Sequence, residues 1–213
     1  MKVYKFRKLN TEQDYCRLRE IIETGKFWCS SFWDLNDPME GIFNITPDLA
    51  KEISKIYGEK GQYKICSFSG KKGFKKPTMW GYYAGGFKGV AIEVEYDAFK
   101  QINYDNKETL FDNKDIEKTV EDILLNKKKV WKDEDEYRFL EKSKENSIKI
   151  GKITAIYFGC PYDNLENSEQ IQKNRQTFIK YKEFKENIIK IAKRKKISYF
   201  DVRVIFDKIT IKN

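Results

Sequence analysis

Hydrophobic and polar residues alternate along several short runs of the chain, which is the pattern of β-strands with one buried face. In the first run, Tyr4 and Phe6 share one face, while Lys5 and Arg7 share the other. The same reading predicts later strands over residues 27–31, 63–69, 90–95, 133–139, 153–159, 202–206 and 209–211.

Apolar residues at helical spacing predict helices between these strands. Asn10 or Thr11 can cap the first helix, which carries Tyr15, Leu18, Ile21 and Ile22 on one stripe and ends at Gly25. The other predicted helices run from Pro47 to Gly58, over one or two turns at 79–84, from Asn113 to Lys127, and over 175–196. The order of elements predicts one α+β domain on a mostly antiparallel or mixed sheet.

The composition is that of a folded protein with a substantial core. The chain has 213 residues, of which 40% are hydrophobic and 35% are charged. No apolar run approaches the roughly 18 residues that a membrane span needs, and residues 1–5 lack the apolar stretch of a signal peptide. We therefore expect a cytoplasmic protein with one domain over 1–213, in which 1–160 carry the motifs and 161–213 form a basic helical extension.

The counts of cysteine and histidine exclude several kinds of site. The four cysteines stand singly, without a Cys-x-x-Cys pair, so a zinc site or a disulfide framework is not expected. The chain has no histidine, which removes Ser-His-Asp hydrolases and nearly all His-ligated metal sites. Any catalysis must use carboxylates, Arg, Lys, Tyr, Ser or backbone groups.

The positive charge is concentrated near the end of the sequence. Residues 173–213 contain thirteen Lys and Arg against four Asp and Glu, and so account for the whole net charge of +9. A basic helix from Lys173 to Lys196 can bind a polyanion such as nucleic acid, or it can be a solvated lysine-rich face.

The run Trp131-Lys132-Asp133-Glu134-Asp135-Glu136-Tyr137-Arg138 places four acids in succession. In an extended strand, Glu134 and Glu136 face one side, with Tyr137 continuing into the core. Two interpretations remain open: a solvated acidic strand balanced by nearby lysines and Arg138, or a carboxylate pair aimed into a cleft. Removal of Glu134 or Glu136 is expected to leave fold stability almost unchanged, or to raise it slightly as repulsion among the four acids is relieved.

Five ordered motifs carry a resemblance to a known family. They are Tyr4-Lys5-Phe6-Arg7, Asn36-Asp37-Pro38-x-Glu40-Gly41, Cys66-Ser67-Phe68-Ser69, Met79-Trp80-x-x-Tyr83-Ala84 with Lys88 to Glu93, and Trp131-x-x-Glu134-x-Glu136-Tyr137-Arg138. Over residues 1 to about 160 the chain resembles the bacterial domain-of-unknown-function family twenty-nine seventy-one. That family supplies a set of motifs more than a function.

The order of these motifs is also similar to that in ADP-ribosyltransferases of the Arg, Ser-Thr-Ser, Glu-x-Glu type. This second resemblance implies an ADP-ribosyltransferase-like fold with NAD as substrate and no metal. It implies that Arg7 holds the NAD phosphates, that Ser67 braces the nicotinamide side of the cleft, and that Glu136 binds the ribose hydroxyl. Glu134, the first acid of the pair, would orient the acceptor.

The remaining candidate cofactor-binding residues are Lys5, Asn36, Asp37, Ser69, Trp80 and Tyr83. Asn36 and Asp37 can bind an adenosine ribose or form a plain turn. Trp80 and Tyr83 can stack on a nicotinamide or a base, or belong to the core.

Two other classes of function stay open. A metal-dependent nuclease could use Asp37, Glu40, Glu93, Glu95 or Glu136 with a lysine, which the basic tail would suit. A non-catalytic nucleotide or nucleic-acid binding module, in phage defence or a toxin system, would use the acidic run only as an ion-pair node.

Overall fold

The computed structural model describes residues 1–35, 44–45, 47–104, 110–111, 115–161, 172, 175–205 and 208–212. The chain forms two compact units, each built from separate stretches of sequence. Unit 1 comprises Met1–Lys26, Phe68–Asp97 and Lys149–Asn213, and unit 2 comprises Phe27–Ser67 and Ala98–Ile148. The expectation of one domain over 1–213 stays a prediction.

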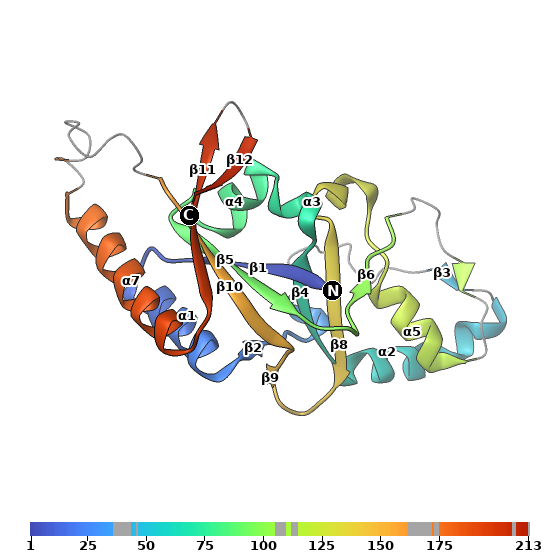
Figure 1. The fold of residues 1–213 in the computed structure, drawn as a ribbon. Helices are drawn as coiled ribbons and strands as arrows, with labels where there is room; N and C mark the ends of the chain where they lie inside the picture. The colour runs from blue at the N-terminus through green and yellow to red at the C-terminus, as the bar shows by residue number, and fades with distance from the viewer. Residues whose placement is uncertain are drawn as a thin grey trace. The chain divides into compact units, whose positions relative to one another are not determined.

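Unit 1 is organised around a mostly antiparallel sheet (Figure 1). Its strands, in spatial order, are β12 (Lys208–Lys212), β11 (Ser198–Ile205), β10 (Lys152–Gly159), β5 (Gly89–Glu95) and β1 (Lys2–Lys8). Only β10 and β11 run parallel among these neighbours, and the helix α7 (Arg175–Arg194) lies between them in sequence. Parallel neighbours need such a crossover connection. The predicted α+β class with a mostly antiparallel sheet is confirmed.

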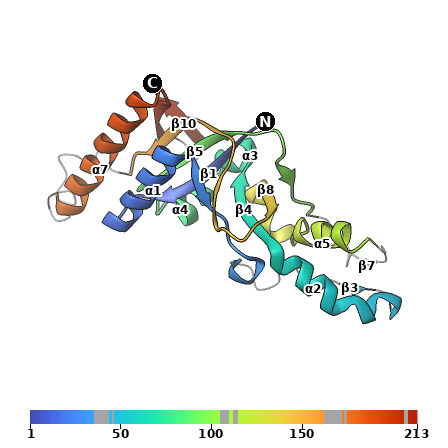
Figure 2. The same ribbon diagram turned by 90° about the horizontal axis from the view of Figure 1, so that it is seen from below.

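The first helix, α1 (Glu12–Thr24), begins and ends as its sequence predicts. The Thr11 side chain accepts a hydrogen bond from the Asp14 N–H, and the Asp14 carboxylate accepts one from the Thr11 N–H. At the other end, Gly25 adopts a left-handed conformation with φ of 70°. Leu18, Ile21 and Ile22 are buried. The helix packs against α7, beside which it lies in Figures 1 and 2.

The core of unit 1 lies between its sheet and two short helices, α3 (Lys71–Phe74) and α4 (Pro77–Tyr83). Tyr4 and Phe6 of β1 face this core, as the alternation predicts. Helix α3 occupies part of the lysine-rich segment 70–76 and buries Phe74. Burial of that aromatic ring orders the segment despite its lysines.

Unit 2 consists of short strands and helices. The order within its main sheet is β4 (Tyr63–Ser69), β8 (Glu136–Lys142), β6 (Lys100–Gln101), and β4 extends into unit 1, where Ser69 pairs with Tyr4. The remaining elements are β2 (Lys26–Trp28), η1 (Phe32–Asp34), β3 (Asn44–Ile45), η2 (Pro47–Glu52), α2 (Ile53–Gln62), β7 (Leu110–Phe111), α5 (Ile116–Leu124), η3 (Lys129–Glu134) and β9 (Ser147–Lys149). Strands β2 and β9 pair, as do β3 and β7.

Helices α2 and α5 pack side by side in unit 2, around a core that includes Ile56, Val120 and Leu124 (Figure 2). The prediction that Gly58 ends the earlier helix is wrong, because α2 continues to Gln62 and buries Ile56 and Lys60. Packing of that face outweighs the roughly 1 kcal/mol that an interior glycine costs a helix. The predicted cap Asn113 lies outside the described residues, and the Asp115 side chain caps α5.

Candidate functional site

The acidic run does not form one extended strand. Glu134 ends the 3-10 helix η3, Asp135 adopts a left-handed conformation with φ of 48°, and β8 begins only at Glu136. The prediction that both glutamates belong to a strand opening is therefore wrong for Glu134. A left-handed residue reverses the local chain direction at little cost for Asp. The two carboxylates nevertheless approach the same cation.

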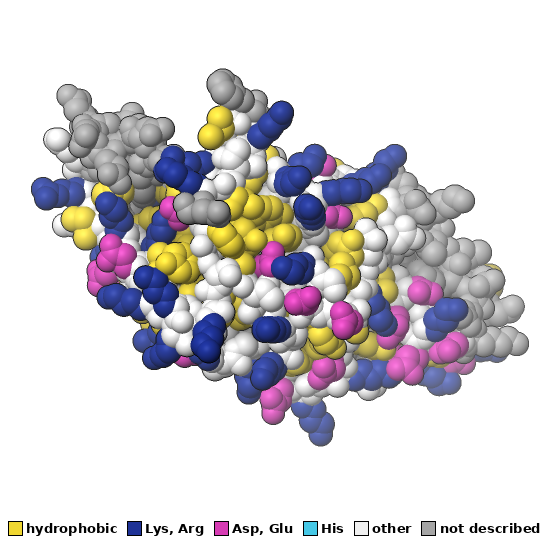
Figure 3. Space-filling model, viewed as in Figure 1, with side chains coloured by type: hydrophobic (Ala, Val, Ile, Leu, Met, Phe, Trp, Pro, Cys, Tyr) yellow, Lys and Arg dark blue, Asp and Glu magenta, His cyan; other side chains and the backbone are white. Residues whose placement is uncertain are grey.

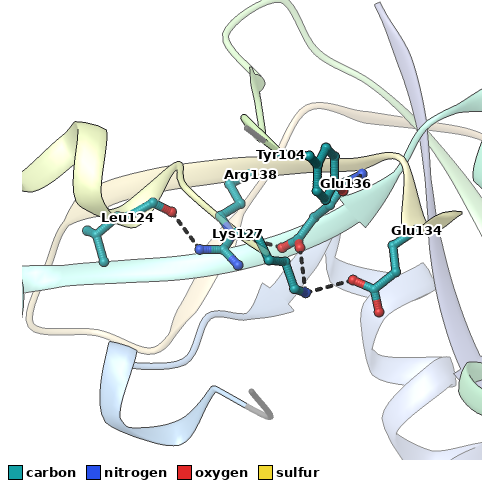
Figure 4. A network of polar contacts seen from close by, with 6 residues as sticks. All are labelled: Tyr104, Leu124, Lys127, Glu134, Glu136 and Arg138. Carbon is teal, nitrogen blue, oxygen red and sulfur yellow. Dashed lines mark hydrogen bonds and ion pairs between the residues drawn. The ribbon is translucent and has the colours of Figure 1, made fainter. Parts of the chain in front are cut away.

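That cation is the Lys127 ammonium, which follows α5. Its Nζ lies 2.7 Å from Oε2 of Glu134 and 2.9 Å from Oε2 of Glu136 (Figure 4). The three side chains are 8%, 12% and 4% exposed respectively. Because water reaches none of them freely, the ion pairs act at a lower effective dielectric than surface pairs do.

A second cation approaches Glu136 from the same strand. Arg138 Nε donates to Oε1 of Glu136 at 2.7 Å, and Arg138 Nη1 donates to the Leu124 carbonyl at 2.5 Å (Figure 4). The Ser67 side chain of β4 also acts to lower the pKa of Glu136. The Glu136 N–H donates to the Tyr104 hydroxyl at 2.7 Å. We call Ser67, Tyr104, Lys127, Glu134, Glu136 and Arg138 the Glu136 network.

Burial and charge act in opposite directions within this network. Burial raises the pKa of Glu136, while the Lys127 charge and the Ser67 hydrogen bond act to lower it. Burial acts to lower the pKa of Lys127, but the charges of Glu136 and Glu134 outweigh it and raise that pKa. Burial also raises the pKa of Tyr104. The network thus joins two carboxylates and two cations inside unit 2.

The predicted alternation of β8 holds only in part. Phe139 is buried, at 5% exposed, but Tyr137 is only half-buried. Glu136 and Arg138 are buried as well, at 3% and 1% exposed. Residues two apart share a face, so this polar pair occupies the face opposite that of Tyr137 and Phe139.

The predicted cofactor residues of the first strand lie in unit 1. Arg7 and Lys5 are half-buried on β1, and Lys5 Nζ lies 5.5 Å from the centroid of the Phe68 ring. Ser69 is buried and donates to the Gly70 carbonyl at 3.5 Å. A shared cleft for Arg7 and Glu136 stays a prediction, because these residues belong to different units.

Trp80 and Tyr83 are parts of α4. The Trp80 ring is completely buried, stacks on Phe87 with centroids 5.4 Å apart, and donates its N–H to the Phe74 carbonyl at 2.9 Å. Tyr83 is half-buried against the same core. Trp80 therefore acts as a core residue in this structure, with its ring stacked on Phe87 and its N–H donor already in use.

Asn36, Asp37 and Glu40 lie outside the described residues. Within the described part of the chain, no three or more His, Cys, Asp or Glu side chains gather as a metal site would require. Glu93, named above only for a nuclease, is buried in unit 1. It accepts hydrogen bonds from Lys2 (2.8 Å), Thr154 (2.6 Å) and Tyr157 (3.1 Å).

The sequence interpretation treated Lys127 and Arg138 as balancing charges and did not name Tyr104 at all. A signal for Arg138 was present, since it stands two positions after Glu136 in a strand. Lys127 offered no local signal, because nine positions and a helical turn separate it from Glu136.

Comparisons with known proteins add no relative: no family model matches the chain, no curated protein matches it, and no solved structure matches it. Among the described residues, no helix combines the length and apolarity needed to cross a membrane.

Proposed function

We propose that this chain binds NAD in a cleft beside Glu136 and transfers ADP-ribose to a macromolecular target, or hydrolyses NAD when water is the acceptor. One observation supports the proposal above the others: the Glu134 and Glu136 carboxylates both contact the Lys127 ammonium, at 2.7 and 2.9 Å. The two acids of the Glu-x-Glu motif are thus held together, as an ADP-ribosyltransferase cleft would need. The Ser67 side chain of the Ser-x-Ser motif also acts to lower the pKa of Glu136.

The proposed chemistry needs a carboxylate beside the ribose. The bond between ribose C1 and the nicotinamide nitrogen breaks, its electron pair leaves with nicotinamide, and positive charge develops on the ribose. Glu136 stabilises that charge, as carboxylates do in glycoside hydrolysis. The acceptor then bonds to C1 and loses a proton, with Glu134 orienting it. A guanidinium fork such as that of Arg7 suits a diphosphate, and the NAD-binding roles of Arg7, Lys5, Ser69 and Tyr83 stay predictions from the sequence.

The test is release of nicotinamide from NAD, measured with and without bacterial lysate or RNA as a source of acceptors. Glu136→Gln should lower turnover by about 100-fold to 1,000-fold, with a smaller effect on NAD binding. Glu134→Gln should spare hydrolysis and impair transfer.

A matched control is Glu121→Gln, since Glu121 belongs to the same unit and pairs with Lys100 at 2.5 Å, outside the Glu136 network. Turnover in that variant should equal turnover in the unmutated protein. Nicotinamide release that persists undiminished per folded molecule in Glu136→Gln would exclude the proposed role of this carboxylate.

A second candidate is a non-catalytic nucleic-acid binding module. It is favoured by the near-complete burial of Glu136, whose two carboxylate oxygens contact Arg138 and Lys127. In this case the Glu136 network stabilises unit 2, and binding rests on basic side chains elsewhere. Nucleic-acid binding without nicotinamide release in any condition would select this function.

A further inference from the structure

Lys127 is held in place by contacts from several elements of unit 2. Its backbone N–H donates to the Asn103 carbonyl at 3.0 Å. Its Nζ lies 5.0 Å from the centroid of the Trp131 ring and within 2.9 Å of one oxygen from each of two carboxylates. An ammonium fixed from three directions cannot move away from the carboxylates without breaking several contacts at once.

We infer that Lys127 is the positioning residue of the candidate site, which holds Glu134 and Glu136 in one arrangement and favours the ionised form of Glu136. This inference rests on the proposed function, because it assigns Lys127 a part in a reaction that needs ionised carboxylates. Lys127 acts through the glutamates and does not itself contact the reacting atoms.

The balance of charge explains why a cation is needed there. Glu136 faces the charges of Lys127, Arg138 and Glu134, and the Tyr104 phenol also lies against it. With Lys127 present, two carboxylates meet two cations. Without it, Glu136 loses one of the cations that contact it while the Glu134 carboxylate stays nearby, and like charges in one site drive the uptake of a proton.

The direction of the pH effect follows from this change. Burial already raises the pKa of Glu136, and the Lys127 charge opposes that rise. Loss of Lys127 should therefore raise the apparent pKa of Glu136 further. NAD turnover should fall in acid as the carboxylate becomes protonated and inactive. Without Lys127, this fall should occur at higher pH.

Unit 2 offers a matched control in Lys142, which also bridges two glutamates. Its Nζ contacts Glu59 and lies 2.8 Å from Glu117, but its side chain is 37% exposed. Water can take over much of the role of an exposed ammonium, so the neighbours of Lys142 should not depend on it as strongly.

The experiment follows the glutamate carboxyl carbons by NMR across pH in folded Lys127→Met, Lys127→Arg and Lys142→Met proteins. In Lys127→Met, the apparent pKa of Glu136 should rise by about one unit or more, a tenfold change in proton affinity. Lys127→Arg should restore the value found in the unmutated protein, because the charge returns. Lys142→Met should leave that pKa unchanged. An unaltered titration in Lys127→Met would overturn the inference.

Two further measurements separate the possible failures. The carboxyl titration needs no substrate, so it tests the charge role of Lys127 independently of NAD turnover. Absence of nicotinamide release from every protein would reject the proposed function and leave that test in place. If Lys127→Met does not fold, the Nζ nitrogen signal of Lys127 in the unmutated protein replaces it. That signal should shift at the pH where Glu136 titrates, and a signal that is insensitive there would overturn the inference.

Discussion

Arg138 and Glu136 form an ion pair within a single strand: Nε of Arg138 lies 2.7 Å from Oε1 of Glu136, and both side chains are almost fully buried. Side chains two positions apart on a strand point to the same face, which brings the pair together without any turn. With Lys127 and Glu134 added, charges that looked mutually repulsive in the sequence form a compensated group.

This arrangement reverses the expectation for stability. Glu136→Gln should lower the free energy of unfolding by about 3–5 kcal/mol, because breaking a buried pair leaves cations without their counter-charge. Denaturant titration measures the loss. Glu141→Gln, at an exposed position on the same strand, should change stability by less than about 0.5 kcal/mol. Equal free energies of unfolding for the two variants would contradict a compensated network. They would support the earlier expectation that the acids in this run only repel one another.

Lys60 should make the stability of the protein depend on pH in the alkaline range. Burial lowers the pKa of Lys60 from 10.5 to about 8, and its Nζ lies 4.3 Å from the centroid of the Phe32 ring. Between these two pH values the unfolded chain binds more protons than the folded one, so stability should rise with pH, by on the order of 2 kcal/mol in total.

Lys60→Met should remove that rise, as measured by denaturant titrations between pH 7 and 10.5. The control Lys55→Met changes an exposed lysine on the same helix, which pairs with Glu52. That variant should keep the rise of the unmutated protein. A rise that survives in Lys60→Met would show that another group causes it.

Glu93 should stabilise unit 1 above acidic pH. Burial acts to raise its pKa, but hydrogen bonds from Lys2 and Thr154 outweigh this and lower that pKa below the ordinary value. The stabilisation is therefore present above the pKa of the unfolded chain and is lost as pH falls through the lower pKa of the folded protein.

Glu93→Gln should cost about 1.5–3 kcal/mol at pH 7, with the difference from the unmutated protein shrinking in acid. Glu95→Gln is the matched control, since Glu95 is the exposed last residue of the same strand. Denaturant titrations at pH 7 and pH 3 check both variants, and a difference that grows in acid would contradict the assigned sign.

The exposed lysines of α7 should bind polyanions in a salt-dependent manner. Dark-blue basic side chains lie along this helix in Figure 3, with some magenta acidic ones among them. Replacement of Lys182, Lys190 and Lys193 by Gln should reduce the salt slope of duplex DNA binding by about two to three, since each phosphate contact contributes about 0.9. Replacement of Lys118, Lys128 and Lys132 in unit 2 is the control. Binding that does not depend on salt would contradict this prediction and show that the lysines form only a solvated face of the helix.

Local patterns in the sequence were sufficient for much of the secondary structure. The capping residues Thr11 and Gly25 predicted α1, and alternation predicted which side chains of β1 enter the core. The paired strands at the end of the chain were also predicted. These features depend on neighbours within a few positions, so the sequence contains the information directly.

Only the tertiary structure decided where the charges of the candidate site lie. The chain continues as a helix through Gly58 because burial of Ile56 and Lys60 stabilises that helix. It turns at Asp135, where an extended strand was predicted. Glu134 and Glu136 were identified from the sequence, but their dependence on Lys127 was not. The protonation of a buried carboxylate depends on its burial and on the charges that the fold brings near it. Its neighbours in the sequence determine neither of these.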